Sequence, residues 1–288
     1  MSEPTVYLDG LYLPQGEARV PVLDRGFIFG DGVYEVLPVY AGEPFRLAPH
    51  LERLERSLRL TAMANPHGRE GWERVIREVV RRNGGGDQSV YLQVTRGVAR
   101  RDHAFPDDTP PTALVMSSPL TPPSAEELAR GAEVISRPDP RWLHCDIKTT
   151  SLLPNVLLRQ EALEAGADEV ILVRDGVVTE AATANLFVVR EGRLLTPQQG
   201  PHLLPGITRD LVLELAANQG IPAGEAALDR RDLAAAEEIW LTSSTREVRP
   251  VTRLDGRPVG TGEAGPLWRR LHTAYQAYKG RIRAGDAH

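Results

Sequence analysis

Residues 141–155 read RWLHCDIKTTSLLPN and contain Lys148, one of only two lysines among the 34 basic residues of the chain. The other, Lys279, lies near the C-terminus. An amine can lose its proton and attack a carbonyl carbon, whereas a guanidinium in practice cannot. A lysine flanked by Ile147 and Leu152 in an arginine-rich chain therefore indicates an amine that is needed for chemistry. The alternative is a solvated lysine at a strand end.

The bulk composition is that of a soluble globular protein, with 288 residues, 41% of them hydrophobic and 25% charged. No apolar run approaches the roughly 18 residues of a membrane span, and no export signal is visible, so we expect a cytoplasmic protein. The net charge of -5 gives no general attraction for nucleic acid or an anionic membrane. Cys145 is the only cysteine, which excludes an intrachain disulfide and a cysteine metal cluster. No metal is expected.

Hydrophobic periodicity predicts strands and helices in two domains. The proline-rich segment SSPLTPPS predicts a linker at 118–124, between an N-terminal α/β domain at 1–117 and a second domain at 125–288. Ser124 and Glu127 have the spacing of a helix capping box. The expected helices are 46–60, 72–80, 124–130, 154–165, 208–219 and 266–282. The expected strands are a hairpin around Asp9-Gly10, then 33–40, 90–94, 113–117, 133–136, 169–173, 177–179, 186–190, 194–196, 238–242 and 248–254.

Three separated motifs follow Lys148: EAATANLF at Glu180–Phe187, LLT at Leu194–Thr196 and LPGITR at Leu204–Arg209. Together they resemble the signature of the class IV aminotransferases, which are fold type IV enzymes that use pyridoxal 5'-phosphate (PLP). Further matches in DRGFIFGDGVYEV, HLERL and TSST extend the resemblance over nearly the whole chain. It implies an α/β (α+β) fold, with a small N-terminal α/β domain and a larger C-terminal pseudo-barrel domain that binds PLP.

Within this family the likeness is closest to the D-amino acid aminotransferases, through YLQVTRG, RRDHAFP and RWLHCDIK. An arginine and a histidine two residues apart in the RRDHAFP loop are the discriminating feature. The resemblance implies transamination of D-amino acids with 2-oxoglutarate or pyruvate as acceptor, in a homodimer whose loop reaches the partner subunit. The alternatives are an aminodeoxychorismate lyase, a branched-chain or (R)-amine transaminase, and a cofactor-binding protein without turnover.

The resemblance also assigns the catalytic role. Lys148 is expected to hold PLP through a Schiff base and to carry the proton between the substrate α-carbon and the cofactor. Glu180 is expected to pair with the pyridine nitrogen and keep it protonated, so that the ring withdraws electrons from the α-carbon. Leu204 is expected to pack against the ring. Taken alone, Glu180 would be a solvated hairpin glutamate and Leu204 a core residue.

The phosphate is expected to meet one arginine and several N–H and hydroxyl donors. Arg53, in HLERL, matches the phosphate arginine of the family, although alone it would be a helix-surface ion-pair partner. The backbone N–H groups of Ile207 and Thr208 begin a helix, where anions bind, and the Thr208 hydroxyl could serve as cap or as ligand. Ser244, in TSST, matches a further phosphate contact, and Ser243 stands beside it. Thr183 is the only hydroxyl where the family has a serine-rich run.

Substrate recognition is expected to fall to Tyr34, Arg101 and His103, which match the residues that grip the α-carboxylate in D-amino acid aminotransferases. A guanidinium suits this task because it binds a carboxylate with two parallel hydrogen bonds. Without the resemblance these residues would be a half-buried strand tyrosine and an exposed loop pair. Arg100 stands beside Arg101, so either arginine could face the substrate, and Asp102 could offset part of their charge.

Overall fold

The computed structural model describes residues 3–285 and divides the chain into two compact units. The first comprises Met1–Thr121, Ile147–Leu152 and Ile282–His288, and the second Pro122–Asp146 and Leu153–Arg281. The change at Thr121 falls inside the expected linker at 118–124. The segment Ile147–Leu152 differs from the expected division, which gave every residue after 124 to the second domain. It joins the first unit because its backbone forms hydrogen bonds with strand β3 (Gly32–Tyr40).

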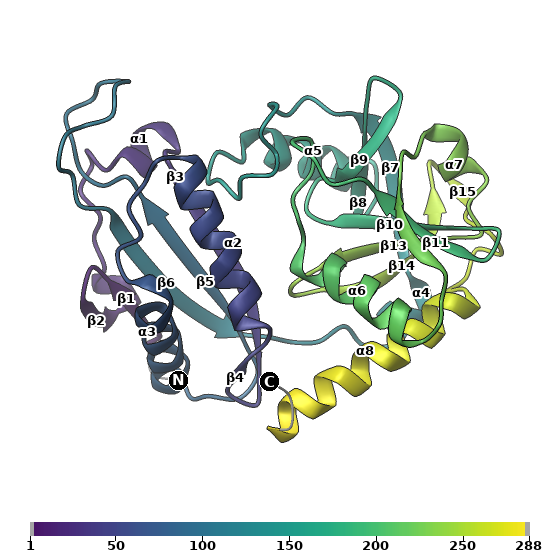
Figure 1. The fold of residues 1–288 in the computed structure, drawn as a ribbon, viewed down its shortest axis with the longest axis horizontal. Helices are drawn as coiled ribbons and strands as arrows, with labels where there is room; N and C mark the ends of the chain where they lie inside the picture. The colour runs from purple at the N-terminus through teal and green to yellow at the C-terminus, as the bar shows by residue number, and fades with distance from the viewer. Residues whose placement is uncertain (1–2, 286–288) are drawn as a thin grey trace. The chain divides into compact units, whose positions relative to one another are not determined.

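The first unit is built on a six-stranded antiparallel sheet with the order β2-β1-β6-β5-β3-β4. Helices α2 (Leu47–Leu60) and α3 (Gly68–Arg82) cover one face of it (Figure 1). The short helix α1 (Arg25–Phe29) precedes β3. The strands are β1 (Thr5–Leu8), β2 (Leu11–Pro14), β3 (Gly32–Tyr40), β4 (Glu43–Pro44), β5 (Gln88–Thr95) and β6 (Thr112–Pro119).

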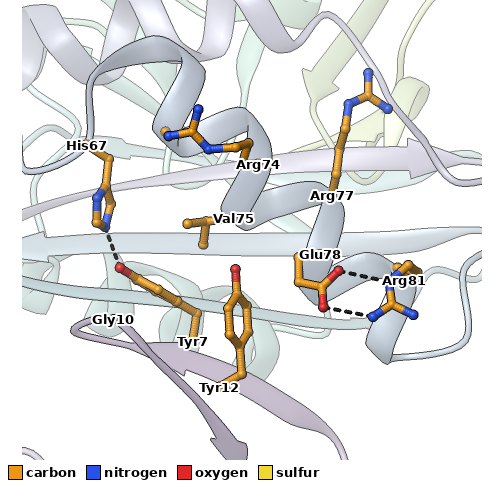
Figure 2. Close-up of a pocket in the computed structure, with 10 residues that line it drawn as sticks. Tyr7, Gly10, Tyr12, His67, Arg74, Val75, Arg77, Glu78 and Arg81 are labelled. Atoms are coloured by element: carbon orange, nitrogen blue, oxygen red, sulfur yellow. Dashed lines mark hydrogen bonds and ion pairs between the residues drawn. The ribbon is translucent and has the colours of Figure 1, made fainter.

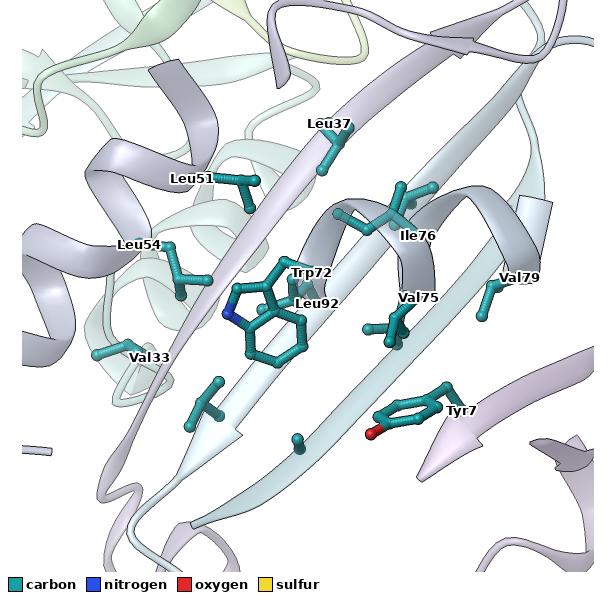
Figure 3. Close-up of a cluster of buried hydrophobic side chains, with 14 of the residues drawn as sticks. Tyr7, Val33, Leu37, Leu51, Leu54, Trp72, Val75, Ile76, Val79 and Leu92 are labelled. Carbon is teal, nitrogen blue, oxygen red and sulfur yellow. The ribbon is translucent and has the colours of Figure 1, made fainter. Parts of the chain in front are cut away.

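The core of this unit lies between the sheet and the two helices. Trp72 and Ile76 of α3 pack on the strands, and Leu54 of α2 joins them (Figure 3). Along β3, the alternation of a strand turns Val33 and Leu37 into this core. Glu35 lies between them on the same face and is fully buried. A charge at that position needs partners inside the core.

The second unit is built on a nine-stranded sheet with the order β12-β11-β10-β13-β14-β7-β8-β9, with β15 paired to β14. The pairs β11–β12, β14–β7 and β7–β8 are parallel and the other pairs antiparallel. The sheet curls into a half-barrel (Figure 1), as the pseudo-barrel expectation requires. Its strands are β7 (Ala132–Pro138), β8 (Glu169–Arg174), β9 (Val177–Ala181), β10 (Asn185–Arg190), β11 (Arg193–Pro197), β12 (Ala223–Ala226), β13 (Glu238–Ser243), β14 (Glu247–Leu254) and β15 (Arg257–Pro258).

The remaining helices are α4 (Ala125–Arg130), α5 (Leu153–Glu164), α6 (Ile207–Asn218), α7 (Arg230–Ala234) and α8 (Pro266–Ala284). All of them belong to the second unit except the last three residues of α8. The predicted capping box of α4 is confirmed, because Ser124 and Glu127 each bond to the other's backbone N–H. Within residues 3–285, no helix is long and apolar enough to cross a membrane.

The elements that the sequence analysis missed are short. They are the 3-10 turn η1 (Gln15–Glu17), α1, β4, β12, α7 and β15. A segment of two to five residues carries too little periodicity to be recognised. Helix α1 is instead set by its ends, since the Asp24 carboxylate accepts from the Gly26 N–H and Gly30 adopts the left-handed conformation at the C-cap. Strand β6 runs to Pro119, two residues into the predicted linker.

Candidate functional site

Lys148 is half-buried in the first unit and lies beside strand β3. Its carbonyl accepts from the Tyr34 N–H at 2.9 Å, and its own N–H donates to the Ser57 hydroxyl at 3.4 Å. The Lys148 Nζ lies 4.3 Å from the centre of the Tyr34 ring. No ion pair to this amine occurs within residues 3–285. The structure therefore brings two of the predicted site residues, Lys148 and Tyr34, into direct contact.

Arg53 is buried and belongs to a charged cluster under helix α2. Its Nε and Nη2 each donate to the Glu35 carboxylate at 2.8 Å, and His50 Nδ1 lies 2.8 Å from the same group. Burial alone would raise the pKa of Glu35, but Arg53 and His50 outweigh it and hold the pKa at about 2. Burial lowers the pKa of His50. The reading of Arg53 as a helix-surface ion-pair partner is wrong, because the carboxylate that holds it comes from β3.

Arg101 and His103 lie in an exposed loop of the first unit and share one neighbour. The His103 ring centre is 5.3 Å from that of Phe29, and the Arg101 guanidinium carbon is also 5.3 Å from the Phe29 ring centre. Phe29 is the last residue of α1. The two predicted substrate residues are therefore held together on one aromatic side chain, which sequence analysis did not identify.

Glu180 is buried in β9 of the second unit, so the solvated-hairpin alternative is wrong. Arg141 Nη1 donates to its Oε1 at 2.5 Å. The backbone N–H of Leu204 and the side-chain amide of Asn185 both donate to Oε2 at 3.1 Å. Asp139 holds the other side of Arg141 with two hydrogen bonds of 2.9 Å. A network of hydrogen-bonding groups thus fixes the position of one carboxylate.

The environment of Glu180 favours its neutral form. Burial raises the pKa of Glu180 to about 7, and Arg141 with the Leu204 N–H offsets only part of that effect. A carboxyl with this pKa is poised to gain or lose a proton near neutrality. It would ionise more readily beside a second positive group, such as a protonated ring nitrogen.

The start of helix α6 lies against this cluster. Gly206, its N-cap, is so close to Asn185 that a β-carbon there would lie 1.9 Å from the Asn185 Oδ1. Ile207 and Thr208 are the first two residues of the helix and both are buried. The N-cap residue is Gly206, which has no side chain, and Thr208 is the second residue of the helix, so the Thr208 hydroxyl does not occupy the N-cap position. The first N–H groups remain suited to an anion.

The remaining predicted cofactor residues lie in the second unit too. Ser243 ends β13 and Ser244 begins the following turn, and both are half-buried. The adjacent Thr242 pairs with Asn185 across β10 and β13, and its buried hydroxyl has no partner within the described part of the chain. The Thr183 hydroxyl donates to the Glu169 carboxylate.

Several residues that form hydrogen bonds with the predicted site residues were not identified from the sequence. Arg141 and Asn185 stand inside the segments RWLHCDIK and EAATANLF, but neither spacing nor residue type indicated that they bond to Glu180. Glu35 carried a usable signal, since it occupies a core-facing position of a strand. His50 lies one helical turn before Arg53, where both side chains can reach the same group.

A different part of the first unit carries a surface pocket of about 620 Å³. Figure 2 shows it between the β1–β2 hairpin and α3, with Tyr7 bonded to His67 and Arg81 bonded to Glu78. None of its lining residues is a predicted site residue. Glu78 holds Arg81 with two hydrogen bonds of 2.8 Å, so this arginine is already neutralised. The pocket therefore contributes nothing to the candidate site.

A family model described as amino-transferase class IV matches residues 32–254. A D-alanine aminotransferase from Bacillus licheniformis is 38% identical over 271 residues, which cover 94% of this chain and 95% of that protein. A D-alanine aminotransferase from Staphylococcus haemolyticus is 34% identical over 95% of this chain and 97% of its own length.

The solved structures that resemble the chain include other aminotransferases. The T.th. branched-chain amino acid aminotransferase with pyridoxamine 5'-phosphate has a TM-score of 0.92 and 30% identity, covering 99% of this chain and 98% of that one. A hypothetical aminotransferase from Mycobacterium tuberculosis in its PLP-bound form has a TM-score of 0.82 and 28% identity, covering 95% and 98%.

Proposed function

Because the chain belongs to the class IV aminotransferases, we propose that it transfers the amino group of D-amino acids to a 2-oxo acid, either 2-oxoglutarate or pyruvate. The enzyme class is that of PLP-dependent aminotransferases. The choice of D-amino acids is supported by one observation above all. Arg101 and His103 are the pair by which the D-amino acid aminotransferases differ from other members of the family, and both side chains lie against Phe29. The D-alanine aminotransferases among the relatives support the same choice.

The residues of the chain suit PLP. A carboxylate buried with a pKa near 7 fits a protonated ring nitrogen, because each charge stabilises the other. Glu180 offers such a group. The uncapped N-terminus of α6 at Ile207 fits the phosphate. The unpartnered hydroxyl of Thr242, next to Ser243, fits an additional hydrogen-bond acceptor.

The proposed roles follow from these positions. PLP, when bound, withdraws electrons from the substrate α-carbon. The Lys148 Nζ would hold the cofactor and then move the proton at the α-carbon, while the Tyr34 ring limits where this amine can go. Glu180 would bind the ring nitrogen, with its position fixed by Arg141. Leu204 would pack on the ring.

Phosphate binding is proposed for donors from several segments of the family signature. Arg53 would supply the cation, held in place by Glu35. Ile207 and Thr208 would supply N–H groups, and Ser243 and Ser244 hydroxyl groups. Their number matters because a phosphate carries up to two charges that must be met locally in a protein with a negative net charge.

The contact of Thr183 with Glu169 bears on its proposed role. Glu169 is buried and its carboxylate accepts from the Thr183 hydroxyl. A hydroxyl that donates to a protein carboxylate can still accept from a donor but has no second proton to give. We therefore propose that Thr183 serves the cofactor indirectly, by ordering the turn after Glu180.

Substrate binding is proposed for Tyr34, Arg101 and His103. The substrate α-carboxylate would take two hydrogen bonds from the Arg101 guanidinium. Tyr34 stacks on Tyr91 with ring centres 5.6 Å apart, which fixes its ring on the sheet. The loop residues would act on the site of a partner subunit, so we propose a homodimer. The exposed Phe27 and Phe105 supply apolar surface for such an interface.

The test of this function is a half-reaction screen of the purified holoenzyme with D- and L-amino acids. We expect D-alanine and 2-oxoglutarate to yield pyruvate and D-glutamate. Conversion of L-leucine with no reaction of D-alanine would replace the proposal by a branched-chain enzyme, which the solved neighbours make the second candidate. Formation of 4-aminobenzoate and pyruvate from aminodeoxychorismate without an amino acceptor would replace it by a lyase. Sedimentation on dilution tests the dimer, which fully active monomers would contradict.

A further inference from the structure

The loop that carries Arg101 and His103 is closed at its base by a buried carboxylate. The Asp24 Oδ2 accepts from the hydroxyls of Thr95 at 2.9 Å and Thr112 at 2.7 Å, which end β5 and begin β6. Gly97 then passes so close to the other arm that a β-carbon on it would lie 2.1 Å from the Pro110 carbonyl oxygen. Only glycine fits that approach, and its φ of +95° also requires glycine. The two arms of the loop are therefore pinned together at the sheet.

A second set of contacts reaches the tip of the loop. Arg25, which is buried in α1, donates from Nη1 to the carbonyl oxygen of Asp102 at 2.5 Å and to that of Ala104 at 3.3 Å. These carbonyls belong to the residues on either side of His103. A single guanidinium thus fixes the backbone on both sides of a proposed substrate residue.

Arg25 is itself held by an acidic residue that also holds a second arginine. The Asp31 carboxylate accepts from Arg25 Nε at 2.8 Å, and from Arg96 Nε at 2.8 Å and Nη2 at 3.0 Å. Arg96 is anchored by donating to the carbonyl oxygens of Thr61 at 2.8 Å and Ala62 at 3.1 Å, after helix α2.

The outer face of Arg96 is covered by the loop. Its guanidinium carbon lies 3.7 Å from the ring centre of Phe105, a residue of the loop whose side chain is otherwise 61% exposed. A cation over an aromatic face is attracted by the electrons of the ring. Arg25 also lies 4.9 Å from the Phe29 ring, on which Arg101 and His103 rest. The loop is thus held at its base, at its tip and from beneath.

We propose that Arg25, Asp31 and Arg96, here called the loop clamp, are positioning residues that preset the loop of residues 98–109 for substrate carboxylate binding. A loop already ordered before binding does not have to lose conformational freedom when the substrate arrives. The clamp therefore lowers the KM for the amino acid and leaves the chemical step to other residues. This inference rests on the proposed function for the role of Arg101 and His103, but not for the order of the loop.

The contacts of the clamp can be removed without opening a large cavity. Asp31→Asn keeps the shape of the side chain and removes the charge that both arginines share. Phe105→Leu removes the aromatic cover of Arg96 and keeps an apolar side chain on the surface proposed for the dimer interface. Arg25→Gln removes the donors to the two loop carbonyls. Arg59→Gln, on the exposed face of α2, is the matched control.

The experiment measures hydrogen exchange of the holoenzyme in peptides that cover residues 98–109, together with KM and kcat for the amino donor. Far-UV circular dichroism and thermal unfolding first establish that each variant is folded. We expect loop exchange to accelerate about tenfold in Asp31→Asn and Arg25→Gln, and less in Phe105→Leu. KM for the donor should rise about tenfold while kcat changes less than about threefold. Arg59→Gln should match the native protein in every measurement.

Unchanged loop exchange in folded Asp31→Asn and Phe105→Leu would overturn the clamp. Faster exchange with an unchanged KM would also overturn it as a positioning device, because the loop would then be ordered without serving the substrate. A failure of the proposed function looks different. In that case the native enzyme would not convert D-amino acids. The hydrogen-exchange data would still report whether the clamp orders the loop. KM would then be measured with the amino donor that the half-reaction screen identifies.

Discussion

Arg141 donates a hydrogen bond of 2.5 Å to Glu180, and both side chains are buried in the second unit. Burial disfavours the ionised form of Glu180 and raises its pKa to about 7, whereas the guanidinium of Arg141 favours the ionised form. The carboxyl is thus balanced between two protonation states in the protein without cofactor. Bound PLP would tip the balance, since a protonated ring nitrogen favours the ionised carboxylate.

This balance makes stability depend on pH in a defined direction. The pKa of Glu180 is raised in the folded state, so the unfolded chain releases this proton first and stability falls as pH rises from about 4.5 to about 7. Arg141→Gln raises the folded pKa further. We expect the cofactor-free variant to keep losing stability between pH 7 and 8, where the native protein levels off.

The measurement is urea unfolding of cofactor-free protein at pH 6, 7 and 8. Arg137→Gln is the control, because Arg137 pairs with Glu161 at the surface. The same loss of unfolding free energy at all three pH values in Arg141→Gln would show that the arginine does not act through the ionisation of Glu180.

Glu180→Gln tests the partner of the ring nitrogen. The amide keeps the shape of the side chain but cannot keep the nitrogen protonated, so the electron withdrawal at the α-carbon weakens. We expect kcat to fall about 10²–10³-fold, as when other preorganised electrostatic groups are removed, while Lys148 still takes up the cofactor. Single-turnover kinetics measure the fall, with Glu161→Gln as control. A kcat within threefold of the native value, roughly 0.7 kcal/mol, would contradict the assignment.

Glu35 gives the opposite pH dependence. Its pKa is lowered from 4.5 to about 2 in the folded state, so its contribution is complete above about pH 4.5 and is lost as pH falls towards 2. Glu35→Gln leaves Arg53 and His50 without their carboxylate. Breaking a buried pair in this way costs about 3–5 kcal/mol near pH 7.

We therefore expect Glu35→Gln to be less stable at pH 7 and to have a flatter stability profile between pH 5 and 2.5. Urea unfolding across that range is the measurement, and Glu55→Gln on the exposed face of α2 is the control. An unchanged acid limb in Glu35→Gln would mean that other carboxylates govern acid unfolding.

The two neighbouring arginines of the loop can be told apart. Arg101 lies over Phe29 beside His103, whereas Arg100 is exposed and makes no such contact. Loss of a hydrogen bond to a charged group is worth about 1.5–3 kcal/mol, so Arg101→Gln should raise the KM for the amino donor about 10–100-fold. Arg100→Gln should change it less than threefold. Steady-state kinetics on both variants decide, and the reverse pattern would assign the carboxylate to Arg100.

Residues that belong to a local sequence pattern could be predicted, whereas contacts between residues far apart in the chain could not. Strand β3 and helix α2 followed from periodicity, because the side chains that repeat are those that enter the core. Lys148 stood out by its rarity, and Glu180 by its motif. The contacts of Arg141 and Asn185 with Glu180 could not be predicted from the sequence, since bonding between residues far apart in the chain depends on strand register and helix packing.

The loop shows the same limit. The RRDHAFP motif predicted Arg101 and His103 as substrate residues, but none of the expected helices included Phe29, which lies in α1. Short helix α1 is recognisable only once its caps at Asp24 and Gly30 are seen. The contact of α1 with the loop, through Phe29, therefore follows from the fold alone.

The most direct test concerns the amine of Lys148. Borohydride reduction of the holoenzyme, followed by digestion and mass spectrometry, shows which side chain is bonded to the cofactor. We predict a pyridoxyl label on the peptide that contains Lys148, and loss of that label in Lys148→Ala. A label on Lys279 or on no lysine, with the cofactor present, would contradict the account.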